Sequence, residues 1–326
     1  MSIPQQQPRL SVRNLDDLVG VVPYLIGFHP NESLVVLILS EGRVELTARV
    51  DLEPMADPAA LADFWSRLDL RFPLAEPWFL TFSRDRDLSW SVLDRCALLV
   101  GEHRLGRVVA VLGDYWEADE PGGATGQVLA SPSAAEAALL GLPARASRQE
   151  LAELVAGPGE GELEQLDQQF MEAAEFLDRR GLRAKRAVLD RLLRATAPLS
   201  EEDAVLAAVL VSEPSRQLSV LRRLSRQNAD QQVELWVSVL RRALPPYRQG
   251  PLGLLGMASW LTGNGALMTI CLEQLEVIDP FGPLPSLLDW LNLRVLPPDC
   301  WPTYRQALLR AVADHLVVAG GGSDTI

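Results

Sequence analysis

The chain has 326 residues, 48% of them hydrophobic and 22% charged, and its formal net charge is −13 at pH 7. A chain of this length forms one large domain or two. Its apolar content excludes disorder over most of the sequence. The acidic charge disfavours nucleic acid as a partner, because a negative surface repels the phosphate backbone.

Several features bear on location. No apolar run reaches the ~18 residues that a membrane helix needs, so no membrane segment is expected. The first residues lack the basic and apolar regions of a secretory signal. Cys96, Cys271 and Cys300 are too far apart, and odd in number, for a disulfide framework or a zinc knuckle. Together these observations predict a cytoplasmic protein.

Arginine dominates the basic residues: Lys185 is the single lysine among the 30 lysines and arginines. Arginine can be selected for recognition. Alanine, leucine, glycine and proline are abundant as well, however, and GC-rich codons encode all of these residues. Codon bias in a GC-rich bacterium therefore explains the composition without a binding role.

The first 130 residues predict an α/β domain of about four strands. Residues 33–40 form a continuous run of branched apolar residues, typical of a strand buried on both faces. Residues 44–52 alternate between apolar and polar, and the Glu41-Gly42 turn joins them to the first strand as a hairpin. Strands and helices then alternate, which implies a parallel crossover. The predicted helices are 14–26, 57–70 and 89–102, and the later strands are 77–83 and 107–112. Residues 113–132 are rich in glycine and acids and predict a loop.

Beyond residue 130 the apolar residues recur at helical spacing. This pattern predicts an all-helical domain over 131–318 and a flexible tail over 319–326. The predicted helices are 132–141, 147–156, 160–180, 182–196, 200–211, 214–226, 228–243, 251–262, 265–278, 284–293 and 302–318.

Residues 251–280 partly follow the tetratricopeptide repeat pattern. Matching positions are Leu252, Leu255, Gly256, Leu272 and Pro280, whereas Ser259 and Met268 depart from the pattern. The segment still predicts a helical hairpin that closes at 263–265 and buries its apolar face against neighbours. The expected fold class is therefore α+β, with an N-terminal α/β domain followed by an all-helical, partly tetratricopeptide-like domain.

The helical half contains two adjacent segments of opposite charge. Residues 149–178 hold nine acids and no base, and residues 179–194 hold seven bases and one acid. The basic segment could bind RNA, DNA or an acidic partner. Alternatively, the acidic helices turn back against the basic one and neutralise it. We favour neutralisation, because the segments are nearly matched in size and no aromatic residues interleave with the arginines.

His29 lies in the turn that leads into the first predicted strand. Its imidazole could lie beside Ser33, with Asp51 or Asp17 to orient it, as in a catalytic arrangement. It could instead hydrogen-bond the backbone of a rigid turn, which is the commoner use of such residues. We favour this structural role.

Two further positions belong to the same candidate region. Arg49 and Asp51 are two residues apart on one strand face, so they could bind an anion or form an ion pair. Asp114 follows the last predicted strand, and ligands of open α/β sheets lie at the carboxyl ends of strands. The candidate binding residues are His29, Ser33, Arg49, Asp51 and Asp114.

Motifs of known chemistry are missing from the sequence. It contains no P-loop, no GxGxxG after a strand, no HExxH and no GxSxG. The histidines His29, His103 and His315 are scattered, so no metal site is expected. No catalytic residue and no cofactor is predicted.

The opening of the chain resembles a bacterial family that is described only as domain of unknown function 4192. The resemblance rests on residues 15–19, 23–36 and 49–52, and it resumes within 235–280. Members of that family often carry cysteines in the loop after the last N-terminal strand, and residues 113–130 contain none. The family has no assigned activity, so the resemblance implies membership and no reaction.

Two functions stay open at this point. The sequence favours a non-enzymatic cytoplasmic interaction or scaffold protein, because catalytic constellations are few and the helical array is long. The alternative is an enzyme or small-ligand sensor with a pocket near His29, Arg49, Asp51 and Asp114. The sequence decides neither enzymatic activity nor oligomeric state.

Overall fold

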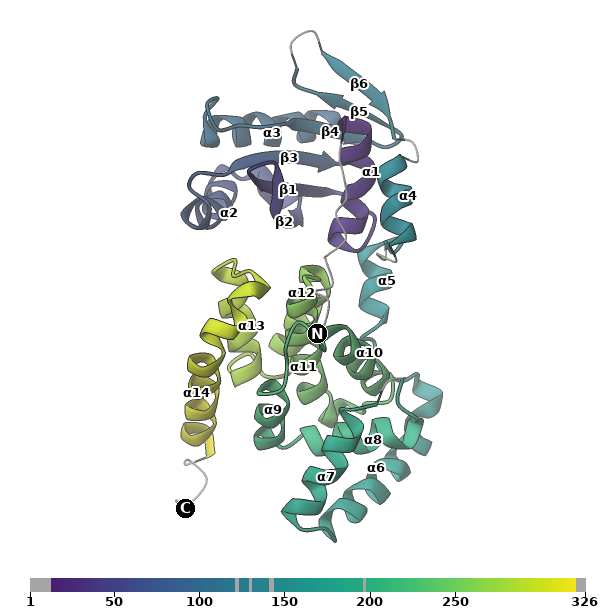
Figure 1. Ribbon diagram of the computed structural model, residues 1–326. Helices are drawn as coiled ribbons and strands as arrows, with labels where there is room; N and C mark the ends of the chain where they lie inside the picture. Colours follow the sequence, from purple (N-terminus) through teal and green to yellow (C-terminus); the bar gives the residue numbers. More distant parts are fainter. Residues whose placement is uncertain (1–12, 121–122, 129–130, 141–143, 196–197, 321–326) are drawn as a thin grey trace, which may run out of the picture. The chain divides into compact units, whose positions relative to one another are not determined.

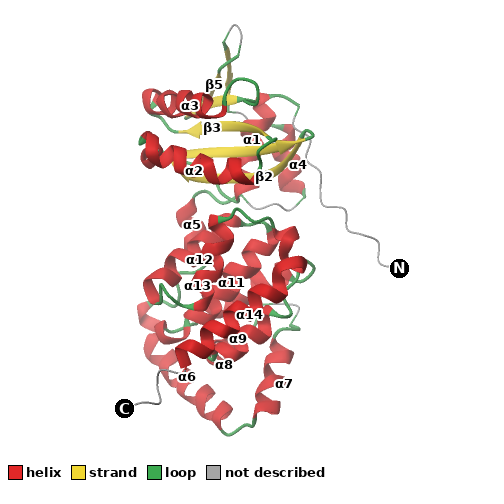
Figure 2. Cartoon of the chain, turned by 90° about the vertical axis from the view of Figure 1, so that its left-hand side faces the viewer, coloured by secondary structure: helices red, strands yellow, loops and turns green. Residues whose placement is uncertain are grey.

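The computed structural model describes residues 13–120, 123–128, 131–140, 144–195 and 198–320, without the side chains of 315–320. Contacts divide the chain into two compact units, residues 1–150 and 151–326. A mixed sheet forms the centre of the first unit, and the second unit is helical (Figures 1 and 2). Most of the tail predicted at 319–326 lies outside the described residues, which end at 320.

Over the described residues the first unit has a six-stranded sheet with the order β2-β1-β3-β4-β5-β6 (Figure 1). The strands are β1 (Ser33–Ser40), β2 (Arg43–Asp51), β3 (Glu76–Phe82), β4 (Val108–Leu112), β5 (Tyr115–Ala118) and β6 (Ala124–Gln127). The pair β3–β4 is parallel, and all other neighbours are antiparallel. The four predicted strands and the parallel crossover are confirmed. The prediction of a loop over 113–132 was wrong, since β5 and β6 form a hairpin there.

Helices cover both faces of this sheet. Trp116 and Glu117 are neighbours on β5, so their side chains point to opposite faces. Trp116 Nε1 donates to Asp16 Oδ1 of α1 (Leu15–Ile26) at 2.8 Å. Glu117 Oε2 accepts from Trp90 Nε1 of α3 (Arg86–Val100) at 3.0 Å. α2 (Pro58–Arg71) contacts α3, and α4 (Pro132–Leu139) packs against α1. β1 is therefore buried along almost its whole length, as its sequence predicts.

Capping residues set where these helices begin and end. Asn14 Oδ1 accepts the Asp17 N–H at 2.8 Å and starts α1. Gly27 ends α1 with φ 88°, a left-handed conformation that glycine adopts without strain. Asp57 and Asp85 accept backbone N–H groups at the first turns of α2 and α3.

The second unit is an array of helices that closely follows the predicted segments. The helices after α4 are α5 (Arg148–Glu153), α6 (Leu163–Asp178), α7 (Leu182–Leu192), α8 (Glu201–Val211), α9 (Pro214–Leu221), α10 (Ala229–Leu240), α11 (Gln249–Thr262), α12 (Gly265–Ile278), α13 (Pro283–Leu293) and α14 (Trp301–Gly320). Short 3₁₀ turns lie at Glu53–Ala56, Glu160–Glu162, Pro245–Tyr247 and Pro298–Cys300. Helical periodicity alone was sufficient to predict the existence of all these helices.

α11 lies at the centre of the helical unit. Every residue from Gly250 to Leu261 is buried, and α11 contacts α8, α9, α10, α12 and α13. α11 and α12 form the predicted hairpin, which turns at Gly263 with φ 83°. Among the described residues no single helix is long and apolar enough to cross a membrane, although α8 and α9, bent by 106°, pass that test as a pair.

Candidate functional site: an arginine-lined groove

Three of the predicted site residues meet at one edge of the sheet. Arg49 Nε donates to Ser33 Oγ at 2.8 Å, and Arg49 Nη1 lies 2.7 Å from Asp51 Oδ1. Ser33 Oγ in turn donates to the Asn31 carbonyl at 2.7 Å. The guanidinium also lies 5.7 Å from the ring centroid of Phe28. These contacts connect the β1–β2 hairpin to the preceding turn. The side chains of Ser33, Arg49 and Asp51 each form a hydrogen bond or an ion pair within the cluster.

The side chains of the other two predicted residues take no part in these contacts. The side chain of His29 is exposed and makes no hydrogen bond with any described residue, although the His29 N–H donates to the Arg145 carbonyl at 2.8 Å. Asp114 is exposed in the turn between β4 and β5. β4 is three strand positions from β2, roughly 14 Å at the usual strand spacing. Asp114 is therefore out of reach of Asp51.

The same sheet edge carries one more polar contact. Ser83 Oγ donates to Glu32 Oε2 at 2.7 Å and accepts the Asp85 N–H at 3.0 Å. Glu32 has φ 43°, which is uncommon for a residue with a side chain. Within the described part of the chain, no group of three or more His, Cys, Asp or Glu side chains could hold a metal ion. This edge therefore resembles a structural network more than a site with open ligands.

In the helical unit, the basic segment 179–194 is not neutralised by the acidic segment as the sequence led us to expect. Two of its seven bases form ion pairs with that segment within the described residues, namely Arg179 with Glu175 and Lys185 with Asp178. Arg191 pairs instead with Asp203 of α8, at 2.7 and 2.8 Å. This hydrogen bonding raises the pKa of Arg191 and lowers the pKa of Asp203. Arg183 and Arg186 line a hollow with Arg216 of α9 and with Arg222 and Arg223, which directly follow that helix.

A groove lined by arginines results. One hollow of about 550 Å³ lies between α7 and α9, and another of about 560 Å³ lies between α9 and α14. Arg222 lines both hollows, so they adjoin. A third cavity of about 360 Å³ lies where α7, α9 and α10 meet, and it shares Arg223 with the first hollow. We call the three together the arginine groove. Its arginines are Arg183, Arg186, Arg194, Arg216, Arg222, Arg223, Arg305 and Arg310.

Few acids balance these eight charges. Arg223 pairs with Asp190 at 2.5 Å, and Arg216 pairs with Glu213 at 3.2 Å. The other six arginines form no ion pair with the described residues. Asp190 is the single acid among the residues that line the groove. The groove is therefore a local positive surface on a chain of net charge −13.

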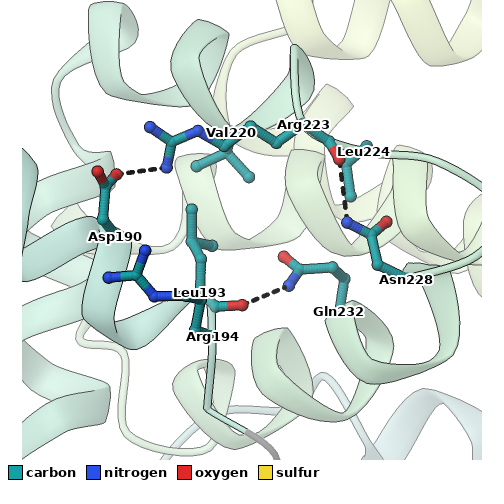
Figure 3. Close-up of a pocket in the computed structure, with 8 residues that line it drawn as sticks. All are labelled: Asp190, Leu193, Arg194, Val220, Arg223, Leu224, Asn228 and Gln232. Atoms are coloured by element: carbon teal, nitrogen blue, oxygen red, sulfur yellow. Dashed lines mark hydrogen bonds and ion pairs between the residues drawn. The ribbon is translucent and has the colours of Figure 1, made fainter.

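The third cavity, which we call the α10 cavity, is the most enclosed of the three (Figure 3). Gln232 of α10 is 3% exposed, and its Nε2 donates to the Leu193 carbonyl at 3.4 Å. Its Oε1 is buried and has no hydrogen-bond partner among the described residues. Asn228 Nδ2 donates to the Arg223 carbonyl at 3.0 Å and holds the opposite wall. Arg194 stands at the rim.

Only part of this groove could be predicted from the sequence. The basic segment of α7 was visible as a run of charge, and the alternative that it binds an acidic partner was left open. The arginines in and after α9 and in α14 are spread over about 100 residues, and only packing brings them into one groove with those of α7. Gln232 belongs to no recognisable sequence motif, so the sequence alone does not identify it as a site residue.

These observations define a protein with an α/β unit, a helical unit and an arginine-lined groove in the latter. The chain matches the family model described as domain of unknown function (DUF4192) over residues 16–299, and it belongs to that family. The match covers most of the chain and confirms the resemblance at its opening. No curated protein and no solved structure matches the chain.

Proposed function

We propose that this protein is a non-enzymatic interaction protein whose helical unit binds an acidic protein segment along the arginine groove. The observation that carries the proposal is the gathering of eight arginines around one aspartate on an otherwise acidic chain. Keeping like charges together has an electrostatic cost, and an anionic partner relieves it. Guanidinium groups match carboxylates in a bidentate geometry, which favours Asp and Glu side chains as the groups bound.

The lining of the groove favours a protein over a nucleic acid. Among the residues that line the two larger hollows none is aromatic, so bases would have no ring to stack on. Leu182, Pro302 and Leu309 provide apolar surface between the arginines, and Ser215 and Ser219 provide hydroxyls. This mixture suits a peptide in which acidic and apolar side chains are interspersed.

Two further expectations belong to this proposal. The helical array around α11 supports a tetratricopeptide-like mode of use, in which packed helix pairs present a groove to a partner. The cytoplasm is the proposed compartment, and the buried, unpaired thiols of Cys96 and Cys271 support it, because reducing compartments preserve free thiols.

The alternative, an enzyme or small-ligand sensor near His29, Arg49, Asp51 and Asp114, has less support. Ser33, Arg49 and Asp51 satisfy one another, and an occupied guanidinium is a poor start for a binding site. His29 and Asp114 are not part of that cluster. The groove has more charge without an ion pair among the described residues.

The test is a fluorescence anisotropy titration with a labelled peptide of alternating Glu and Leu at about 0.05 and 0.3 M salt. We expect binding that weakens with salt, and a loss of at least about tenfold in affinity for Arg186→Glu and Arg222→Glu. Arg241→Glu is the matched control, because Arg241 is exposed at the end of α10, outside the groove, and forms no ion pair with the described residues.

Two results would overturn the proposal. One is that the groove variants and Arg241→Glu bind the acidic peptide equally well. The other is that a single-stranded RNA or DNA of the same length binds more tightly than the peptide and loses affinity with the same variants. The second result would assign the groove to nucleic acid instead.

A further inference from the structure

The α10 cavity contains a hydrogen-bond acceptor that the fold leaves unused. Donation from Gln232 Nε2 to the Leu193 carbonyl fixes the orientation of the amide, since the flipped form would set two carbonyl oxygens against each other. Oε1 is then the atom that faces the cavity, and Figure 3 shows it directed toward the space between Leu193, Val220 and Asn228. A buried acceptor without a partner costs free energy. A ligand with an N–H or O–H at this point would remove that cost.

The same cavity has one uncompensated positive charge. Arg223 is neutralised by Asp190 at 2.5 Å. The Arg194 guanidinium forms neither an ion pair nor a hydrogen bond with the described residues, and Figure 3 shows it on the same side of the cavity as Asp190 and Arg223. A ligand that donates to Gln232 is thus expected to place an anionic group near Arg194.

Apolar side chains complete the walls. Leu193, Val220 and Leu224 line the cavity, and Val220 and Leu224 are each 1% exposed. The volume of about 360 Å³ lies at the lower end of the range for ligand pockets, roughly 300–1,000 Å³. The site therefore fits a short group with an apolar body, one donor and one negative charge.

We propose that the α10 cavity binds the free C-terminal residue of the acidic segment. This inference rests on the proposed function and names which part of the partner enters the cavity. A C-terminal residue has all three features in one place: a backbone N–H for Gln232 Oε1, an α-carboxylate for Arg194 and a side chain for the apolar wall. An ionised Asp or Glu side chain in mid-chain has acceptors only and no apolar bulk, so it fits less well. Capture of a terminal carboxylate is a known mode of peptide recognition.

The experiment compares three versions of one labelled acidic peptide that ends in leucine. The first has a free C-terminal carboxylate, the second has a C-terminal amide, and the third has a free carboxylate but an N-methylated final peptide bond. We expect the free acid to bind at least about tenfold more tightly than either modified peptide. The amide removes the charge for Arg194, and the methyl group removes the donor for Gln232.

Protein variants assign these preferences to the cavity. Arg194→Gln should abolish the preference for the free acid over the amide and leave the effect of N-methylation. Gln232→Met should do the reverse, and circular dichroism checks that this buried substitution keeps the fold. Because Arg194 is exposed, Arg194→Gln keeps the test decisive even where Gln232→Met unfolds the protein.

Each outcome bears on one of the two proposals. Equal binding of all three peptides to the unmodified protein would overturn the C-terminal inference and leave the groove proposal standing. A preference for the free acid that survives Arg194→Gln would also overturn it. Failure of all three peptides to bind would overturn both.

Discussion

Replacing Gly253 with alanine should destabilise the helical unit, although alanine is the better helix former. Gly253 lies within α11, and its neighbour across the helix interface is Leu284 of α13. An added Cβ would lie 2.8 Å from Leu284 Cβ and 2.9 Å from Leu284 Cγ. Carbon atoms in good contact are about 3.5–4.0 Å apart. A rotamer change cannot move Leu284 Cβ, so α13 itself must shift by roughly 0.7–1 Å.

The expected magnitude follows from two opposing effects. Overpacking of a well-packed core costs ~1–3 kcal/mol. The gain in helix propensity from glycine to alanine returns about 1 kcal/mol. We therefore expect Gly253→Ala to lower the free energy of unfolding of the helical unit by up to about 2 kcal/mol.

The measurement has to separate the helical unit from the α/β unit, because two units need not unfold together. Differential scanning calorimetry gives the transitions, and hydrogen exchange of peptides from 249–262 and 283–293 gives the local effect. Gly265→Ala is the matched control: Gly265 is the first residue of α12, and an added Cβ there meets no atom within 4 Å. The control should stay within about 0.5 kcal/mol of the unmodified protein.

A double variant, Gly253→Ala with Leu284→Ala, tests the contact between these two positions directly. Leu284 is 1% exposed, so Leu284→Ala should cost ~2–5 kcal/mol by itself. In the double variant the new methyl group enters space that Leu284 has left, and the combined loss should fall short of the sum by more than about 0.5 kcal/mol. Additive losses, or a Gly253→Ala protein more stable than the original, would refute the close approach of α11 and α13.

Elements with a strong period could be predicted from the sequence, and the β5–β6 hairpin could not. Its strands have four residues each, too few for a period to emerge. The glycines in this stretch predict a loop. In the structure a Cβ on Gly126 would lie 2.5 Å from atoms of the Trp116 indole, so the glycine makes room for a tryptophan on the neighbouring strand. Glycine within a strand marks such close approaches as well as turns.

The charge pattern was visible in the sequence, but its pairing was not. Matching runs of acids and bases suggested that α6 and α7 neutralise each other. Apolar faces decide how helices turn, however, because burial outweighs exposed ion pairs. α7 buries Leu189 and Leu192, and this orientation directs Arg183 and Arg186 toward α9. Ion pairs then form with whatever acids lie near.

The remaining predictions concern polar groups whose surroundings the structure defines. His29→Ala should change the free energy of unfolding by less than about 0.5 kcal/mol, because the imidazole is exposed. A thermal melt measures this change. A loss of ~1–3 kcal/mol, as expected for a buried hydrogen bond, would contradict this prediction and support the structural role that the sequence favours. Arg49→Ala should cost about 1–2 kcal/mol, because the Arg49 side chain is 16% exposed and also holds a β1 hydroxyl. Asp51→Asn should cost less than about 0.5 kcal/mol, because the Asp51 side chain is 69% exposed. Equal losses for Arg49→Ala and Asp51→Asn in urea titrations would contradict both expectations.

The last prediction concerns pH. A hydrogen bond from Arg191 lowers the pKa of Asp203, so the folded state favours the ionised carboxylate. The stability that this pair provides is present above the unfolded-state pKa of Asp203 and is lost as the pH falls through its lower folded-state pKa. Asp203→Asn removes this dependence, so its melting temperature should fall less steeply than that of the unmodified protein below about pH 4. Parallel melting curves for the two proteins through that range would show that the pair does not contribute to stability.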